Sequence, residues 1–128
     1  MTRSKEKLID DAVLAASLAG EKSSTQINSF ITMIRSDQSV FGVKKLMLYI
    51  SRQMGRKEKK QPILNEKFGK QLLETIGELS NEENPSTLVE NYLTFIKWSY
   101  EALKDRRDPA KGKELKGLND LIKVIKEQ

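Results

Sequence analysis

The sequence predicts an all-α protein, a compact single-domain bundle of about five to six helices. Apolar residues recur at steps of three and four along most of the chain, and no segment shows the period-two alternation of a strand. Short polar stretches containing Gly, Pro, Ser or Asn separate these segments. The 128 residues suit one modest core, so residues 1–128 are expected to form one helical domain.

The first helix is expected from Ser4 to Ala19, before a glycine. Its inward stripe consists largely of alanines, which pack closely but bury little area. Residues 1–22 are therefore expected to form a peripheral N-terminal helix. A second helix is expected to begin at Ser24 or Thr25, either of which can cap it, and its apolar residues follow helical spacing.

The stretch from Val40 to Lys60 dominates the functional interpretation. Apolar residues at helical spacing predict a face that enters the core: Val40, Val43, Leu46, Met47, Ile50 and Met54. Cations fall on the other faces or just beyond the helix: Lys44, Lys45, Arg52, Arg56, Lys57, Lys59 and Lys60. Gly55 is expected to end this helix. The run from Arg56 to Gln61 precedes a proline and is expected to be a loop.

Two long helices are expected in the second half of the chain. Asn65 can cap one that ends near Leu79, and a capping box at Thr87–Glu90 is expected to open the other. The broad apolar arc of the latter predicts a central helix. Trp98 lies out of phase with this arc, and a rim position, a subunit contact and stacking on a base remain open for it.

The C-terminal segment begins with a charged break that contains Asp108-Pro109. A last helix is expected from Glu114 to Lys126. Because its apolar stripe needs a partner, residues 106–128 are expected to pack in cis or to extend the domain toward another subunit.

The composition excludes several kinds of chemistry. Without Cys or His, the chain has no disulfide, no Cys/His zinc site and no imidazole or thiolate catalyst. Glycine-rich phosphate-binding motifs are also absent. The acidic pairs Asp10-Asp11 and Glu82-Glu83 are expected to be surface residues. We therefore expect no enzyme, no cofactor and no metal.

Charge is distributed unevenly along a chain whose net charge is +5. Val40–Lys60 is strongly basic, whereas Glu74–Glu90 is acidic. Such sidedness favours docking on a nucleic-acid backbone, although an ordinary solvated surface is the alternative. No apolar run approaches the ~20 residues of a membrane span, and the charged N-terminus does not read as a secretory signal. A cytoplasmic protein without membrane contact is expected.

Three segments together resemble the small α-helical subunit of type III CRISPR effector complexes, with the Csm kind favoured. Thr25–Phe30 resembles the Ser/Thr-Gln-Ile/Leu-Arg-x-apolar start of a family helix, although Asn28 stands in place of the arginine. Lys44–Lys57 resembles a lysine-containing helix that ends in Ala-Gly-Arg-Lys, without the family's proline and tyrosine. Tyr92–Lys104 resembles a late aromatic-rich helix. The turn at Met33–Ser36 and the Trp98 helix are also similar to the sister subunit of Cmr-type complexes.

The resemblance implies a non-catalytic subunit of an antiviral defence complex. Such subunits form an oligomer, a short filament beside the crRNA-bound backbone subunits and the large polymerase-like subunit, and their basic faces line the channel for target RNA. The implied contacts to RNA phosphates are Lys44 or Lys45 with Arg56 and Lys57. Arg52 is added from the basic face itself, and Arg35 is a weaker addition.

Two other functions remain open on the sequence alone. In one, the chain is a helical protein-interaction adaptor whose basic face meets an acidic partner. In the other, it is a small DNA-binding helical regulator, although a helix-turn-helix glycine signature is absent. Arg56 has a further alternative role, as a cation near the negative end of a helix dipole.

Overall fold

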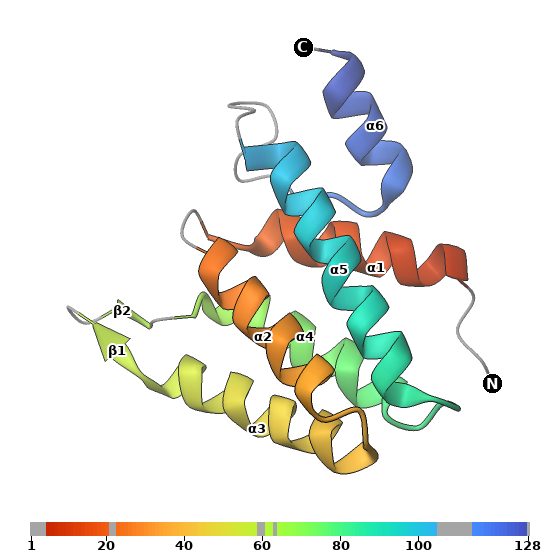
Figure 1. Cartoon of the computed structure of the whole chain (residues 1–128). Helices are drawn as coiled ribbons and strands as arrows, with labels where there is room; N and C mark the ends of the chain where they lie inside the picture. Colours follow the sequence, from red (N-terminus) through yellow and green to blue (C-terminus); the bar gives the residue numbers. More distant parts are fainter. Residues whose placement is uncertain (1–4, 21–22, 59–60, 63, 105–113, 128) are drawn as a thin grey trace.

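The computed structural model describes residues 5–20, 23–58, 61–62, 64–104 and 114–127, and of Lys57, Glu58, Gln61 and Pro62 it describes only the backbone. This part of the chain is all-helical apart from one very short ribbon, as the sequence predicts. The six helices are α1 (Lys5–Leu18), α2 (Ser24–Ser36), α3 (Val40–Gly55), α4 (Glu66–Leu79), α5 (Pro85–Lys104) and α6 (Leu118–Lys126). They form a bundle with α6 and α3 at opposite ends (Figure 1).

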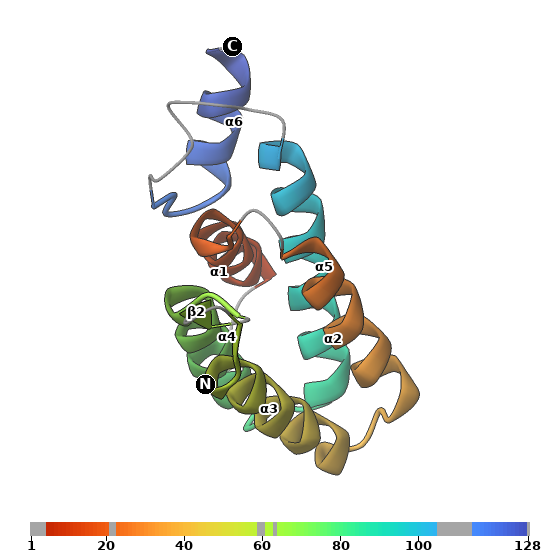
Figure 2. The ribbon, with the colours of Figure 1, turned by 90° about the vertical axis from the view of Figure 1, so that its left-hand side faces the viewer.

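Helix α5 is the central element of the bundle. It contacts α1, α2, α3 and α4, which confirms the position that its broad apolar arc predicts. Helix α3 lies along α4 on one side and α2 on the other. Viewed from the side, α1 is seen end-on between α4 and α5, beneath α6 (Figure 2).

One large hydrophobic cluster joins the first five helices. Each helix contributes fully buried side chains at helical spacing, which is why the sequence pattern located the core correctly. The largest fully buried side chains are those of Tyr92, Phe30, Phe68, Ile27, Ile34, Leu46, Ile50, Leu64, Leu72, Ile76, Leu79 and Leu93, of which Leu64 precedes α4 and the others lie on helices.

The expectation of a peripheral first helix is wrong. Helix α1 is enclosed by α4, α5 and α6, and Ala12 and Ala15 are completely buried. The small side chains that suggested a peripheral position instead allow α1 to approach α5 closely. Each alanine buries little area because its side chain is small, and here this small size permits close packing and does not indicate an exposed helix.

Several element boundaries differ from the sequence prediction. The N-cap of α2 is Ser23, without a side-chain hydrogen bond, rather than Ser24 or Thr25. Helix α5 begins at Pro85, in the first turn where proline is favoured, so Thr87–Glu90 lies inside the helix and is not a capping box. Helix α6 begins at Leu118, after Gly117. Between α3 and α4, where a loop is expected, two-residue strands β1 (Lys57–Glu58) and β2 (Gln61–Pro62) pair antiparallel.

Helix α6 packs in cis, on α1. Its inner side joins a second, smaller cluster of buried residues, which are Val13, Leu115, Leu121 and Val124. Two side chains of α1 receive hydrogen bonds from the segment that enters α6: Leu118 N donates to Asp10 Oδ1 at 2.9 Å and Leu115 N to Ser17 Oγ at 3.0 Å. Asp10 therefore caps a helix distant in sequence. The predicted break at Asp108-Pro109 lies outside the described residues.

Candidate nucleic-acid interface

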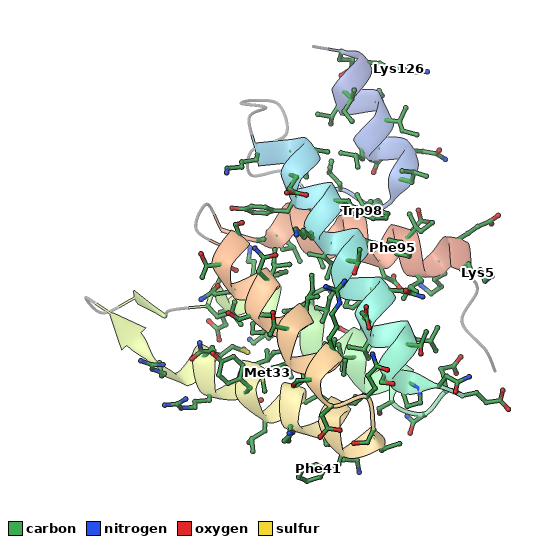
Figure 3. The ribbon with its side chains drawn as sticks, in the orientation of Figure 1. Lys5, Met33, Phe41, Phe95, Trp98 and Lys126 are labelled. Carbon is green, nitrogen blue, oxygen red and sulfur yellow. The ribbon has the colours of Figure 1, made fainter. Side chains whose placement is uncertain are left out.

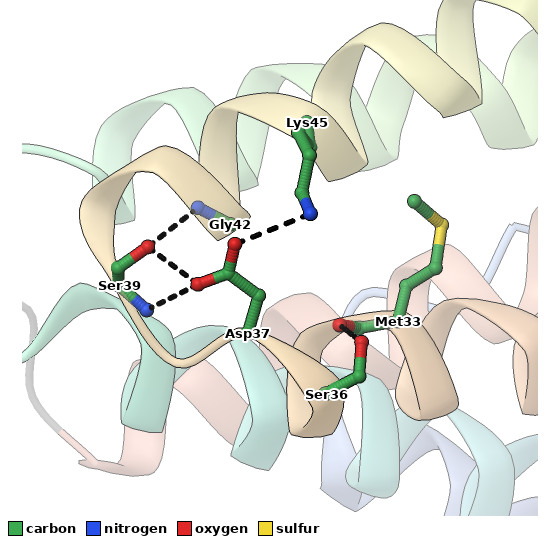
Figure 4. Close-up of polar contacts among 6 residues, drawn as sticks. All are labelled: Met33, Ser36, Asp37, Ser39, Gly42 and Lys45. Carbon is green, nitrogen blue, oxygen red and sulfur yellow. Dashed lines mark hydrogen bonds and ion pairs between the residues drawn. The ribbon is translucent and has the colours of Figure 1, made fainter.

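The basic helix α3 begins at a tightly bonded corner. Ser39 is its N-cap, and the Ser39 hydroxyl accepts a hydrogen bond from Gly42 N at 3.0 Å. The Asp37 carboxylate accepts from Ser39 N at 3.2 Å and from the Ser39 hydroxyl at 2.5 Å (Figure 4). The hydrogen bond from the Ser39 side chain, followed by that from Lys45, lowers the pKa of Asp37 below its ordinary value.

Helix α3 buries one side and exposes the other. The buried side chains include Val43, Leu46 and Ile50, as the spacing predicts. Val40 is an exception, because it stands in the first turn and is 51% exposed. We define the outer face of α3 as five exposed residues along its length: Phe41, Lys44, Lys45, Leu48 and Arg52. Helix α3 itself contains no acidic residue.

Lys44 and Arg52 are the two cations of this face without a counter-charge. Among the described residues, neither forms an ion pair or hydrogen bond through its side chain. They stand about 12 Å apart along the axis, at about 1.5 Å per residue. Their charges are therefore available to two separate anionic groups, such as two phosphates of one strand.

Lys45 is held in a different way. Its Nζ lies 3.2 Å from Asp37 Oδ2 and 5.4 Å from the centroid of the Phe41 ring. The ion pair is partly exposed, so it restrains the side chain without removing it from solvent. Of the two adjacent lysines, Lys44 is consequently the freer one.

The remaining predicted RNA contacts lie just beyond the C-terminal end of α3 or on α2. Arg56 is exposed at the C-cap of α3, where its Nη1 donates to Gln53 Oε1 at 3.4 Å. Lys57 belongs to β1, and its side chain is outside the described part of the structure. Arg35 lies on α2 and its Nε donates to Glu90 Oε2 at 2.9 Å. The acidic stretch thus neutralises Arg35 but none of the described cations of α3.

Sequence reasoning did not include two members of the outer face. Phe41 is 66% exposed and Leu48 is 72% exposed. Phe41 projects from α3 away from the rest of the bundle (Figure 3). Both residues fall out of phase with the buried stripe of α3. This spacing is the feature of the sequence that could have placed them on the exposed face. The outer face is therefore a cationic surface with an apolar ridge along its middle.

The other candidates lie elsewhere on the molecule. Trp98 is 61% exposed on α5, and its ring lies 5.7 Å from that of Phe95. Within the described residues, no group of three acidic side chains is placed to hold a metal ion. In the same part of the chain, none of the helices combines the length and apolar character needed to cross a bilayer.

Comparison with models of protein families, with curated proteins and with solved structures gave no match to this chain. Two features of the chain bear on its function: the outer face of α3 and the three sequence segments that resemble a known family. Those segments lie on α2, on α3 together with the first residue of β1, and on α5.

Proposed function

We propose that this chain is the non-catalytic small subunit of a type III CRISPR interference complex, where α3 contacts the phosphates of target RNA. Its partners in this proposal are the crRNA-bound backbone subunits, the large polymerase-like subunit and further copies of itself along a filament. Such an assembly works in the cytoplasm.

One observation carries the proposal: an exposed helix face presents Lys44 and Arg52 without acidic partners among the described residues. A nucleic-acid backbone supplies regularly spaced anions along a line, which suits cations arranged along a helix. Contacts of this type fix position rather than base identity, which agrees with a subunit that leaves sequence recognition to a guide RNA.

The resemblance adds the type of assembly. The three segments that carry it contribute buried residues, such as Phe30 on α2 and Tyr92 on α5, as well as the exposed cations of α3. Because the buried members form a single core with α3, they hold the basic helix in place. The resembling segments thus include part of the core as well as the basic helix, which supports a related role.

The proposal is tested by isolating the tagged chain from the cells that contain its gene. Co-purification of RNA with large CRISPR subunits is expected, and nuclease treatment should remove the target RNA. A protein partner that persists after nuclease, with no RNA and no CRISPR subunits, would instead favour the adaptor. Specific retardation of duplex DNA by a dimer of the isolated chain would favour the DNA-binding regulator.

A charge-reversal experiment tests the site within the assembly. The variant Lys44→Glu/Arg52→Glu should weaken binding of single-stranded target RNA and reduce the slope of log affinity against log salt by roughly 1.4, since each lost phosphate contact removes about 0.7. Lys123→Glu/Lys126→Glu is a matched control, because both lysines are exposed on α6 at the far end of the bundle (Figure 1). Equal loss in both variants would contradict the site.

A further inference from the structure

The outer face of α3 contains more than cations. Phe41 and Leu48 lie seven residues apart on the same side of the helix, and both expose most of their side chain. Exposed apolar patches that polar residues surround commonly mark interaction sites. Phosphate contact alone gives no reason for an aromatic ring at this position.

We infer that Phe41 is a stacking platform for an unpaired base of the RNA whose phosphates the outer face of α3 contacts. This inference rests on the proposed function and specifies the form of nucleic acid that the same site takes. Single-strand binding surfaces combine a cationic groove or face with aromatic rings, because the backbone is anionic and every base has an apolar π-face. A base that is not held in a pair can turn out of the strand and lie against such a ring.

The surroundings of Phe41 fit this role. Lys45 Nζ lies 5.4 Å from the ring centroid, and Lys44 stands one turn further along on the same face. A base placed on the ring would therefore have cations within reach of its own phosphate. The ridge continues to Leu48, about 10 Å along the axis, which offers a second apolar surface before Arg52.

A protein partner is the competing occupant of an apolar and cationic face. The absence of any acidic residue on α3 and the two uncompensated cations favour a polyanion. A protein contact would accept any apolar side chain of similar size at position 41, whereas stacking requires an aromatic ring. This difference makes the two occupants separable by experiment.

The test uses the full chain and a labelled RNA of about 12 nucleotides without secondary structure, a length within the range of single-strand sites. The second probe is an oligomer of equal length and charge that lacks the bases. Phe41→Leu is expected to lower affinity for the RNA on the order of tenfold, the effect of losing one stacked base, and to leave affinity for the base-free oligomer unchanged. Phe41→Tyr should retain wild-type affinity for both.

Fluorescence gives an independent readout. In the variant Phe41→Trp/Trp98→Phe, the tryptophan at position 41 should be quenched by the RNA and not by the base-free oligomer. Both substituted residues are largely exposed, so the fold should be retained.

The outcomes separate the two proposals. Equal RNA affinity of Phe41→Leu and wild type would overturn the stacking inference and leave the apolar ridge to a protein. If Lys44→Glu/Arg52→Glu still weakened binding, the proposed function would stand. If neither oligomer bound at protein concentrations up to about 0.1 mM, the weak end of non-specific nucleic-acid binding, the stacking inference would fail, whereas co-purification and the charge-reversal variant of the assembly would still decide the proposed function.

Discussion

Lys45 is paired with Asp37 across the corner between α2 and α3, with 3.2 Å between Nζ and Oδ2. The same carboxylate accepts two hydrogen bonds from Ser39, whose hydroxyl in turn caps α3 through Gly42 N. Lys45, a basic residue of the outer face, is therefore bonded to the group of residues that caps the N-terminus of its own helix. This relationship divides the cations of α3 into a restrained lysine and the freer Lys44 and Arg52.

The first prediction concerns the titration of Asp37. Ser39→Ala should raise the pKa of Asp37 toward its ordinary value, because the Ser39 side chain is the largest cause of its lowering. Lys45→Ala should raise it less. Because the pKa is lowered in the folded state, the associated stability is present above the ordinary pKa and is lost as pH falls through the folded value, below about pH 4. Carboxyl chemical shifts of the three proteins against pH test this order, and identical titration curves would contradict it.

The second prediction concerns Gly42. A Cβ at this position would overlap the backbone carbonyl oxygen of Asp37, whereas a Cβ at Gly55 would meet nothing within 4 Å. Gly42→Ala should therefore lower the free energy of unfolding by about 1–3 kcal/mol, as overpacking does. Gly55→Ala, at the other end of the same helix, should change it by less than about 1 kcal/mol. Urea unfolding of both variants gives the comparison, and equal effects would argue against a sterically tight corner.

The third prediction concerns the packing of α1. Ala15 is completely buried, so Ala15→Leu should destabilise the protein by about 1–3 kcal/mol. Glu6→Leu places the same side chain at an exposed position of the same helix and should change stability by less than about 0.5 kcal/mol. Thermal unfolding measures both. A neutral Ala15→Leu would restore the view of α1 as a peripheral helix.

The fourth prediction concerns Arg35, whose partner is Glu90. Because both side chains are partly exposed, a double-mutant cycle with Arg35→Ala and Glu90→Ala should give a coupling energy below about 1 kcal/mol.

The same ion pair bears on RNA binding. Arg35→Ala should weaken RNA binding less than Arg52→Ala does, since the charge of Arg35 is already compensated by Glu90. An equal loss of RNA affinity would show that the ion pair opens when RNA binds.

The fifth prediction concerns the docking of α6. Asp10→Ala removes the acceptor of Leu118 N and should cost about 1 kcal/mol, the usual value of a lost cap. Gly117→Ala should also destabilise, because its Cβ would come within 2.5 Å of Asp10 Oδ1. In the double variant the clash is gone, so the two costs should not add. Hydrogen exchange of the α6 amides reports the effect, and full additivity would argue against the contact.

The sequence by itself determined the all-α class, the approximate limits of most helices and the membership of the core. These follow from helical periodicity and from capping residues such as Asn65, both of which act locally. The outward basic side of α3 was predictable from the same periodicity. When one face of the helix is apolar and enters the core, the opposite face is left to solvent.

Only the tertiary structure decided which neighbours each residue meets. Periodicity could not show that the alanines of α1 allow close contact with α5, that Asp10 caps α6, or that Glu90 pairs with Arg35 rather than closing a capping box. It also did not distinguish free Lys44 from restrained Lys45, since adjacent residues share one pattern. The physical reason is that spacing fixes the direction of a side chain on its own helix, whereas ion pairs and close packing depend on what the other helices bring to that side.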